Sequence, residues 1–472
     1  MRQKRPSSPA NHTDESQQPK GHRLACQSRS HLRRPATVLA LLITVAACGR
    51  IAEPSGTASS AASPTTEALT TVVQTSPPSS TSVGLPPSDP TFVDQWMEDL
   101  DQLDASVRAY HPDPFAIHPE SDWIAKLVEL RSTLPTTPDA QLVQLASLIG
   151  LLDTHSWIGP PGELHAYEVV FYPFIDGWFV IRARDPQLIG TRLISVGGVP
   201  IDEVEATLRP LVPSDNESGE LDALEGPMSS VEYLHGAGIV VEPAEPAYVL
   251  QRRDGSTVTV NPGILPEDVW IDELGIVGDL MGDAPEAVAR RTEPVWTRLY
   301  PSTKTFLISY NDYTDNDLPP AIAEMQEALA SGSADRVVLD MRYLRGGNGS
   351  LAVPLVDALT GDPRISGEGG LVVLIGRENV SAGTVVAAAL ERGSQAVFVG
   401  EPTPARADNF LCDCHEITLR HSGFRVEVPT FSFHTGDLRD AIAPDIPMAL
   451  ASTDFFAGRD PVLEAVLTEN LP

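Results

Sequence analysis

The stretch from Thr303 to Gly400 alternates apolar runs with helical patterns, and this alternation limits the fold more than any other feature of the chain. Continuous apolar runs of this length are typical of strands buried on both faces, which occur in parallel sheets with helical crossovers. The expected strands lie at 304–311, 336–342, 371–376 and 395–400, and the expected helices at about 318–330, 352–360 and 382–393. We therefore predict an α/β core with a parallel sheet, whose sites lie beyond the carboxyl ends of the strands.

Two further pieces of different character precede this core. Residues 91–152 carry apolar side chains at three- and four-residue spacing and predict helices, the first broken at Pro112. From about 167 the pattern changes to short alternating strands. Residues 189–208 place a strand, a Gly-Gly turn, a strand and a helix in the order that resembles peptide-binding PDZ-like domains. We predict a helical segment at 91–166, a PDZ-like β-rich module at 167–265 and the α/β core at 266–472.

The N-terminus predicts export. Residues 1–47 carry eight Lys or Arg and two acidic residues, and an apolar run of about ten residues follows Arg33 and Arg34. Such a run is too short to span a bilayer, which needs roughly 20 residues, but it suits a secretory leader. Small residues directly before Cys48 resemble the bacterial lipobox. This resemblance implies cleavage before Cys48, with removal of residues 1–47, and attachment of a lipid to Cys48. An ordinary signal peptide with an incidental cysteine is the alternative.

Residues 48–90 are rich in Ser, Thr, Pro and Ala, and we expect a disordered tether between lipid and folded protein. The formal net charge of the 472 residues is −31 despite the basic leader. So acidic a protein repels phosphate backbones and anionic headgroups, so we expect no nucleic-acid partner and membrane contact through the lipid anchor only. We expect no metal and no cofactor. Cys412 and Cys414 could pair with each other or remain reduced.

One hydroxyl stands at the turn from an apolar run into a helical pattern. Ser381 follows the strand expected at 371–376, and the very small residues Ala382 and Gly383 come next. Serine is favoured as a helix N-cap, which is one reading of this position. The other reading is a nucleophile, since small neighbours admit a substrate carbonyl and helix N-terminal amides favour a developing oxyanion.

Two other segments support the hypothesis that Ser381 is a nucleophile. Gly346 and Gly347 follow the neighbouring strand, where glycines permit tight turns and expose backbone amides. A phosphate-binding loop is excluded because the G-x-x-x-x-G-K-[ST] pattern is absent, although a plain strand–helix turn is not. A serine nucleophile needs a base, and His155, between Thr154 and Ser156 at the end of an apolar helix, is the most suggestive histidine.

In combination these segments resemble the S41 peptidases, which include the C-terminal processing proteases and the tricorn core protease. Residues 337–350 are similar to the family's D-x-R-x-x-x-G-G strand and loop, and residues 378–390 to its S-A-G/S elbow. The other matching segments, in family order, are LLDTHSWI at 151–158, TFLISYND at 305–312, VFVGEPT at 397–403, ITLRHSGFRVEVPT at 417–430 and IAPDIPM at 442–448.

The resemblance implies a core of the ClpP/crotonase-like type and a role for each matching residue. Ser381 would be the nucleophile and His155 the general base, with Thr154 assisting it. Backbone amides of Gly346, Gly347, Ala382 and Gly383 would form the oxyanion hole.

Two departures from the family's pattern concern the base and its partner. Arg406 aligns with the position of the lysine base in the processing proteases. Because arginine stays protonated, a Ser–Lys dyad is excluded. The glutamate that the histidine-type members use before their P-D-I close aligns with Leu438. Asp437 and Asp440 flank that position, and Asp440 is the candidate for the acidic third member of a catalytic triad with Ser381 and His155.

The expected function is that of an envelope-anchored serine endopeptidase, exported and held on the outer face of the bacterial cytoplasmic membrane. It would hydrolyse peptide or protein substrates through an acyl-enzyme on Ser381. One alternative is a catalytically degenerate lipoprotein that binds peptide or another ligand in the same cleft. A plain envelope interaction protein is the other, and it would not need Ser381 and His155 to converge.

Overall fold

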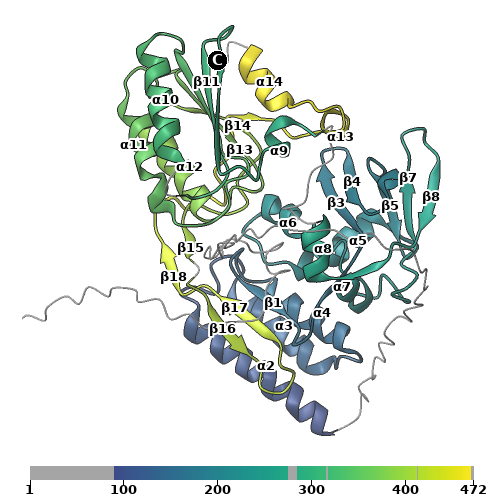
Figure 1. Ribbon diagram of the computed structural model, residues 1–472. Helices are drawn as coiled ribbons and strands as arrows, with labels where there is room; N and C mark the ends of the chain where they lie inside the picture. Colours follow the sequence, from purple (N-terminus) through teal and green to yellow (C-terminus); the bar gives the residue numbers. More distant parts are fainter. Residues whose placement is uncertain (1–89, 275–283, 315–316, 412, 469–472) are drawn as a thin grey trace, which may run out of the picture. The chain divides into compact units, whose positions relative to one another are not determined.

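A six-stranded sheet forms the centre of the α/β core in the computed structural model, which describes residues 90–274, 284–314, 317–411 and 413–468 (Figure 1). Its strands, in spatial order, are β10 (Val295–Tyr300), β11 (Thr305–Tyr310), β12 (Arg336–Asp340), β13 (Leu371–Ile375), β14 (Val397–Gly400) and β19 (Ile446–Pro447). β10 is antiparallel to β11, and the other neighbours are parallel. The predicted parallel sheet is thus present, with one antiparallel edge strand.

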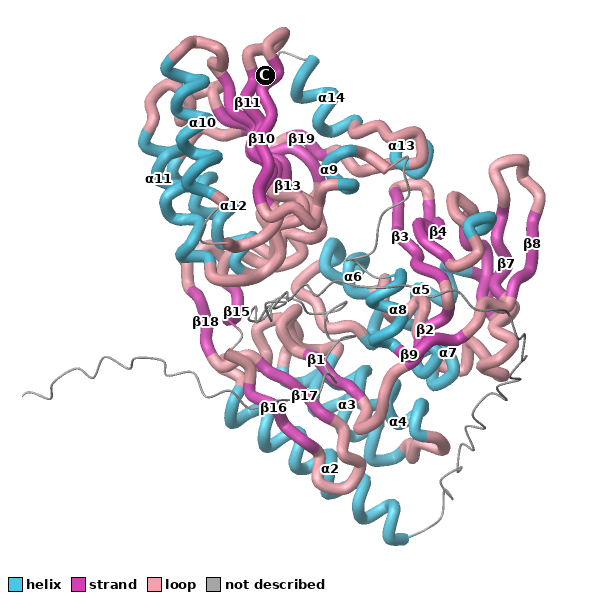
Figure 2. The backbone as a smooth tube through the Cα atoms, viewed as in Figure 1, coloured by secondary structure: helices cyan, strands magenta, loops and turns pink. Residues whose placement is uncertain are grey.

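Helices cover both faces of this sheet. α10 (Leu318–Ala330), α11 (Val353–Gly361) and α12 (Ala382–Gly393) pack on one face, where Ile308, Leu339 and Val373 are fully buried (Figure 2). The opposite face packs against α14 (Pro461–Thr468) through Val462 and Val466. Since side chains alternate between the faces of a strand, burial of both faces requires the continuous apolar runs seen in the sequence.

Three N-terminal helices share a second hydrophobic core with a distant hairpin. The helices are α2 (Pro90–Tyr110), α3 (Glu120–Ser132) and α4 (Pro138–Ile149). A small sheet of β1 (Trp157–Gly159), β17 (Arg425–Val428) and β16 (His415–Thr418) packs on them, with Val426 and Val428 fully buried. This hairpin therefore lies outside the α/β sheet, although the sequence places it within the α/β core at 266–472. Its apolar face is completed by the helices, which no local pattern reveals.

The β-rich module contains a separate sheet. Its strands are β3 (Val169–Phe174), β4 (Gly177–Ala183), β5 (Arg192–Val196), β7 (Tyr248–Gln251) and β8 (Thr257–Val260), and β6 (Val199–Pro200) pairs with β5. Gly197 and Gly198 both have positive φ in the tight turn between β5 and β6, and α5 (Ile201–Leu208) follows. The order of strand, Gly-Gly turn, strand and helix is as expected, while the PDZ-like character of the module stays a prediction.

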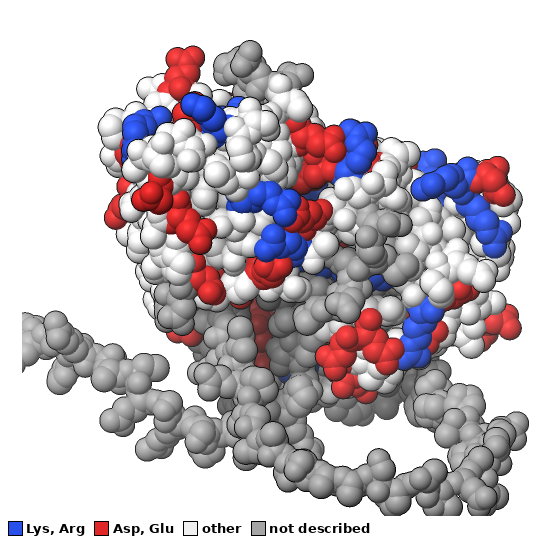
Figure 3. Space-filling view, turned by 45° about the horizontal axis from the view of Figure 1, so that its top comes forward, with Lys and Arg blue, Asp and Glu red and all other residues white. Residues whose placement is uncertain are grey.

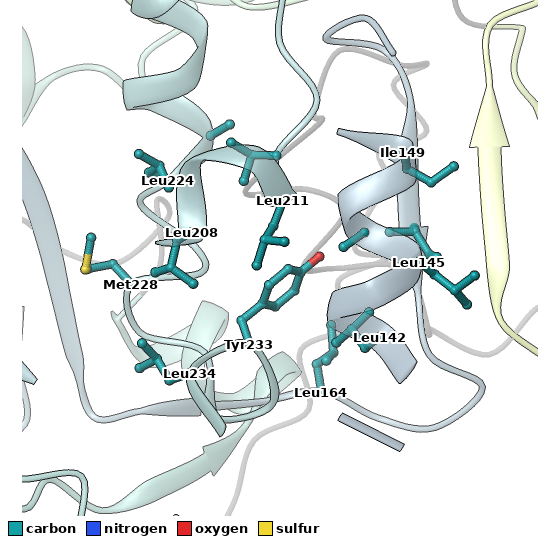
Figure 4. Packing of buried hydrophobic residues seen from close by; sticks show 14 of the residues in the cluster. Leu142, Leu145, Ile149, Leu164, Leu208, Leu211, Leu224, Met228, Tyr233 and Leu234 are labelled. Atoms are coloured by element: carbon teal, nitrogen blue, oxygen red, sulfur yellow. The ribbon is translucent and has the colours of Figure 1, made fainter. Parts of the chain in front are cut away.

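The module and the helical segment share one continuous hydrophobic core. Figure 4 shows leucines of α4 facing a cluster from residues 208–234, which includes Leu211 and Tyr233. α6 (Glu217–Ala223) and α7 (Val231–Gly236) belong to this stretch. The remaining elements are β2 (His165–Tyr167), β9 (Ile264–Pro266), α8 (Glu267–Leu274), α9 (Glu286–Ala289), β15 (Asn409–Leu411), β18 (Phe431–Phe433) and α13 (Ser452–Phe455).

On the face shown in Figure 3, acidic and basic side chains are interspersed over the described surface. None of the helices in the described ranges is both long and apolar enough to cross a bilayer. The predicted leader and lipid-bearing Cys48 lie outside the described residues, as do the tether as far as residue 89 and Cys412. Cys414 is disulfide-bonded.

Candidate active site

Ser381 occupies a strained turn between β13 and α12. Its φ is 55° and its ψ is −119°, and it is one of three non-glycine residues with positive φ in the described part of the chain. A non-glycine residue held in such a conformation costs about 1–3 kcal/mol, and strain of this kind gathers at functional sites. The side chain makes no capping hydrogen bond and is 3% exposed. Helix capping therefore does not explain this serine, and a sharp strand-to-helix turn is the kind of position at which serine nucleophiles are found.

A buried asparagine builds this turn. The Asn379 side chain accepts a hydrogen bond from the Gly376 amide at 3.1 Å and donates to the carbonyl groups of Met341 and Leu344. Its own carbonyl accepts from the Thr384 hydroxyl at 2.6 Å. Asn379 thus ties the turn after β13 to the loop after β12. Our reading of the sequence missed it, although an asparagine two residues before Ser381 is a turn-forming signal.

The glycine loop after β12 packs directly against the start of α12. A Cβ atom added to Gly383 would lie 2.2 Å from the Leu344 carbonyl oxygen, and one added to Gly349 would lie 3.3 Å from the Ala382 Cβ. On the other side of the loop, Gly347 packs against the Tyr313 ring, where an added Cβ would lie 2.7 Å from Cδ2. The structure thus brings the loop that contains Gly346 and Gly347 next to Ala382 and Gly383, as an oxyanion hole would require.

His155 lies in the loop between α4 and β1, with its side chain 1% exposed. Its Nδ1 atom is 3.5 Å from Asp153 Oδ1. Neither ring nitrogen has a hydrogen-bond partner among the described residues. An imidazole with a carboxylate beside Nδ1 and an uncommitted Nε2 has the arrangement of a general base.

Asp153 is the carboxylate beside His155, and its contacts keep it charged. It accepts hydrogen bonds from His111 Nε2 at 2.6 Å, from the His155 amide at 2.8 Å and from the Ser156 hydroxyl at 3.1 Å. Burial alone would raise the pKa of Asp153, but the contacts with His111 and His155 outweigh it and hold the pKa far below its ordinary value. No role was predicted from the sequence for Asp153 or His111, although Asp153 stands two residues before His155.

Thr154 and Asp440 each contact residues other than His155. The Thr154 amide and hydroxyl both donate to Asp215 Oδ1 at 3.1 Å, and the hydroxyl accepts from the Asp215 amide at 3.0 Å. The side chain of Asp440 is 77% exposed and lies 3.9 Å from Arg406 Nη2. Asp437 pairs with Arg439. The structure therefore places Asp153, rather than Asp440 or Asp437, beside the imidazole of His155.

The partly buried Arg406 pairs with the buried Asp215. The Arg406 amide donates to Asp215 Oδ2 at 3.0 Å, and the guanidinium Nε lies 3.8 Å from the same oxygen. Burial and the proximity of Asp153 raise the pKa of Asp215. The arginine in the slot of the lysine base is thus held by carboxylates, which is consistent with a role other than proton transfer.

No protein-family model and no curated protein matches this sequence. Among solved structures, mature CPAF complexed with lactacystin matches with a TM-score of 0.56 and 14% identity over 80% of this chain and 97% of that one. A CPAF mutant in which a serine is replaced by alanine matches with a TM-score of 0.56 and 13% identity, over 81% and 99% of the two chains. A putative S41 protease from Bacteroides fragilis gives a TM-score of 0.28, too low to add to the argument.

The class that the fold defines is therefore that of the mixed α/β proteins built like CPAF. The resemblance to S41 peptidases predicted from the sequence is confirmed at the level of this fold. At this identity the likeness shows the fold alone, and the chemistry rests on the residues described above.

The buried Asp153 makes the His155 loop sensitive to acid and to substitution. Because its folded-state pKa lies below the ordinary 3.8, Asp153 stabilises the fold above about pH 3.8 and loses this effect as the pH falls further. Asp153→Asn replaces one of the two carboxylate oxygens by a donor, so at least one of His111, Ser156 and the His155 amide loses its acceptor. The free energy of unfolding at pH 7 is therefore expected to fall by about 3–5 kcal/mol. The difference in free energy of unfolding between wild type and Asp153→Asn should become smaller as the pH falls below 3.8.

Urea unfolding of both proteins between pH 3 and pH 7 measures this gap. Asp335→Asn is the matched control, since the Asp335 side chain is 70% exposed, and it should change stability by less than about 0.5 kcal/mol. Equal stability of wild type and Asp153→Asn at pH 7 would contradict the prediction.

Proposed function

We propose that this chain is a serine endopeptidase of the S41 type that hydrolyses peptide bonds through an acyl-enzyme on Ser381, with His155 as general base. The observation that carries the proposal is the conformation of Ser381. A non-capping serine is held at positive φ on a strand-to-helix turn, directly beside a glycine loop. Strained backbone of this kind gathers at functional sites, and a serine on a sharp strand-to-helix turn is placed for nucleophilic attack.

The chemistry follows from the contacts of His155 and of the two loops. His155 Nε2 takes the proton of the Ser381 hydroxyl while the oxygen attacks the peptide carbonyl carbon. The imidazolium that forms is stabilised by the charged Asp153 at its Nδ1 side. Backbone amides of the glycine loop and of Ala382 and Gly383 hold the tetrahedral oxyanion. His155 then protonates the leaving amine, and water attacks the ester with His155 again as the base.

The location of the activity is part of the proposal. The basic leader and Cys48 support export and lipid attachment, so the enzyme would act on peptides or proteins outside the cytoplasmic membrane. The β-rich module at 167–265 would present a peptide terminus or control its access to the site. Fold likeness to CPAF, which has been solved in complex with lactacystin, makes that compound a useful second probe.

Cleavage of a fluorogenic peptide library by the purified full-length protein tests the proposal. Ser381→Ala is expected to reduce cleavage by about 10⁶-fold, because removal of the nucleophile prevents acylation. Ser394→Ala, at the other end of α12, is the matched control and should cleave as wild type does. Cleavage that survives in Ser381→Ala would contradict the assignment. A folded wild type that cleaves nothing would point instead to a binding protein.

A further inference from the structure

The segment from Asp215 to Asp222 contacts both halves of the proposed catalytic machinery. It contains all of α6 (Glu217–Ala223) except Ala223. It is here called the α6 strap. No sequence motif marks it, and the family resemblance assigns it nothing.

At its first residue the strap holds the loop of the base. The Asp215 carboxylate accepts from the amide and the hydroxyl of Thr154, the residue directly before His155. The Thr154 hydroxyl in turn accepts from the Asp215 amide at 3.0 Å. The Asp215 side chain is 1% exposed, so these bonds are shielded from competing water.

The middle of the strap lies on the loop that follows β14. Asn216 Nδ2 donates to the carbonyl groups of Thr403 and Asp440, at 3.1 and 2.7 Å. The Ser218 hydroxyl donates to the Pro402 carbonyl at 2.7 Å. A Cβ atom on Gly219 would lie 2.6 Å from the Pro404 carbonyl oxygen, so the helix backbone sits directly against this loop.

At its last residue the strap holds the loops of the nucleophile. Asp222 accepts two hydrogen bonds from the Arg345 guanidinium, at 3.3 and 3.1 Å, in a bidentate pair. Arg345 Nε donates to Glu378 Oε2 at 3.0 Å. Arg345 directly precedes Gly346, and Glu378 stands three residues before Ser381. One guanidinium therefore joins the strap, the glycine loop and the turn that carries the serine.

This junction is mostly shielded from solvent and charged. The side chains of Arg345, Asp222 and Glu378 are 16%, 11% and 12% exposed. Burial would raise the pKa of Glu378, but the proximity of Arg345 and Arg291 outweighs it and lowers the pKa. A lysine could not replace Arg345, because a point charge cannot donate to both carboxylates in the planar fork geometry.

We infer that Arg345 and Asp222 are positioning residues that set Ser381 and its oxyanion loop relative to His155 through the α6 strap. The inference rests on the proposed function. Neither residue touches substrate in this account. Both fix the glycine loop and the Ser381 turn to the α6 strap, which is bonded at Asp215 to the His155 loop. A misplacement of about 1 Å in such a site costs about 100-fold in rate.

The test compares Arg345→Lys, Asp222→Asn and the double variant with wild type as full-length proteins. Each single change is expected to lower kcat for a peptide substrate by about 30–100-fold with little change in KM. The double variant should be no slower than Arg345→Lys alone, because that change already breaks the bidentate pair with Asp222. Arg364→Lys is the matched control, since Arg364 is 49% exposed and pairs with its near neighbour Asp362, and its kcat should be that of wild type.

Hydrogen exchange gives a readout that does not depend on activity. In both single variants, amides at 344–349 and 376–383 are expected to exchange faster, while those of β11, β12 and β13 keep wild-type protection. Unchanged exchange in the two loops would overturn the inference, as would loss of protection throughout the sheet, which marks a merely structural role. An inactive wild type would refute the proposed function, and the exchange results would still decide whether the strap orders the two loops.

Discussion

Replacement of His155 by alanine is expected to lower the rate of Ser381 acylation by about 10,000-fold or more, because the serine hydroxyl then has no base. The loss of stability should be modest by comparison. Neither ring nitrogen of His155 has a hydrogen-bond partner among the described residues, so removing the ring leaves no polar group stranded. Asp153 keeps its bonds from His111 and Ser156.

Such a separation of activity from stability is the mark of a catalytic residue. Peptide cleavage and thermal unfolding of the same protein samples measure the two quantities. His434→Ala is the matched control, because the His434 side chain is 76% exposed and lies 3.5 Å from Asp408, and it should leave both unchanged. An active His155→Ala protein would show that another group serves as the base.

The second large effect, on both stability and acylation, is expected from the single methyl group that Gly383→Ala adds. In most helices a change from glycine to alanine adds up to about 1 kcal/mol of stability. At Gly383 the added Cβ would lie 2.2 Å from the Leu344 carbonyl oxygen, a backbone atom that cannot rotate away. We expect Gly383→Ala to lose about 3 kcal/mol of stability. It should also slow acylation by about 100- to 1,000-fold, because the amides beside the glycine loop shift.

The matched control is Gly361→Ala at the end of α11, where an added Cβ meets nothing within 4 Å. It should be neutral or stabilise the protein by up to about 1 kcal/mol. Urea unfolding and peptide cleavage measure both variants. If Gly383→Ala were as stable and as active as wild type, the close packing of the two loops would not matter for the site.

The core of the fold could be predicted because its signals are local. Apolar runs bounded by turns marked the strands of the parallel sheet, and the helix expected at about 318–330 is found at Leu318–Ala330. Ser381 was likewise visible, since a serine followed by two very small residues at the end of a buried strand is a local pattern. The glycine loop was recognisable for the same reason.

What the sequence analysis missed depends on contacts between distant residues. Thr154 and Asp215 are 61 positions apart, and Arg345 and Asp222 are 123 apart, so no periodicity connects them. The hairpin of β16 and β17 was assigned to the α/β core because the helices that complete its hydrophobic face lie some 300 residues earlier. Asp440 was predicted as the acidic member of the triad from its position shortly before the P-D-I motif. The structure instead places the Asp153 carboxylate beside the His155 imidazole.

Reaction of the full-length protein with a fluorophosphonate, followed by peptide mapping, tests the central claim most directly. Such a probe forms a covalent bond only with an activated serine. We predict a single phosphonylated residue, Ser381, with no labelling of Ser381→Ala and a labelling rate for His155→Ala reduced by about 10,000-fold. A correctly folded wild type that remains unlabelled, or a label on a different serine, would contradict the account.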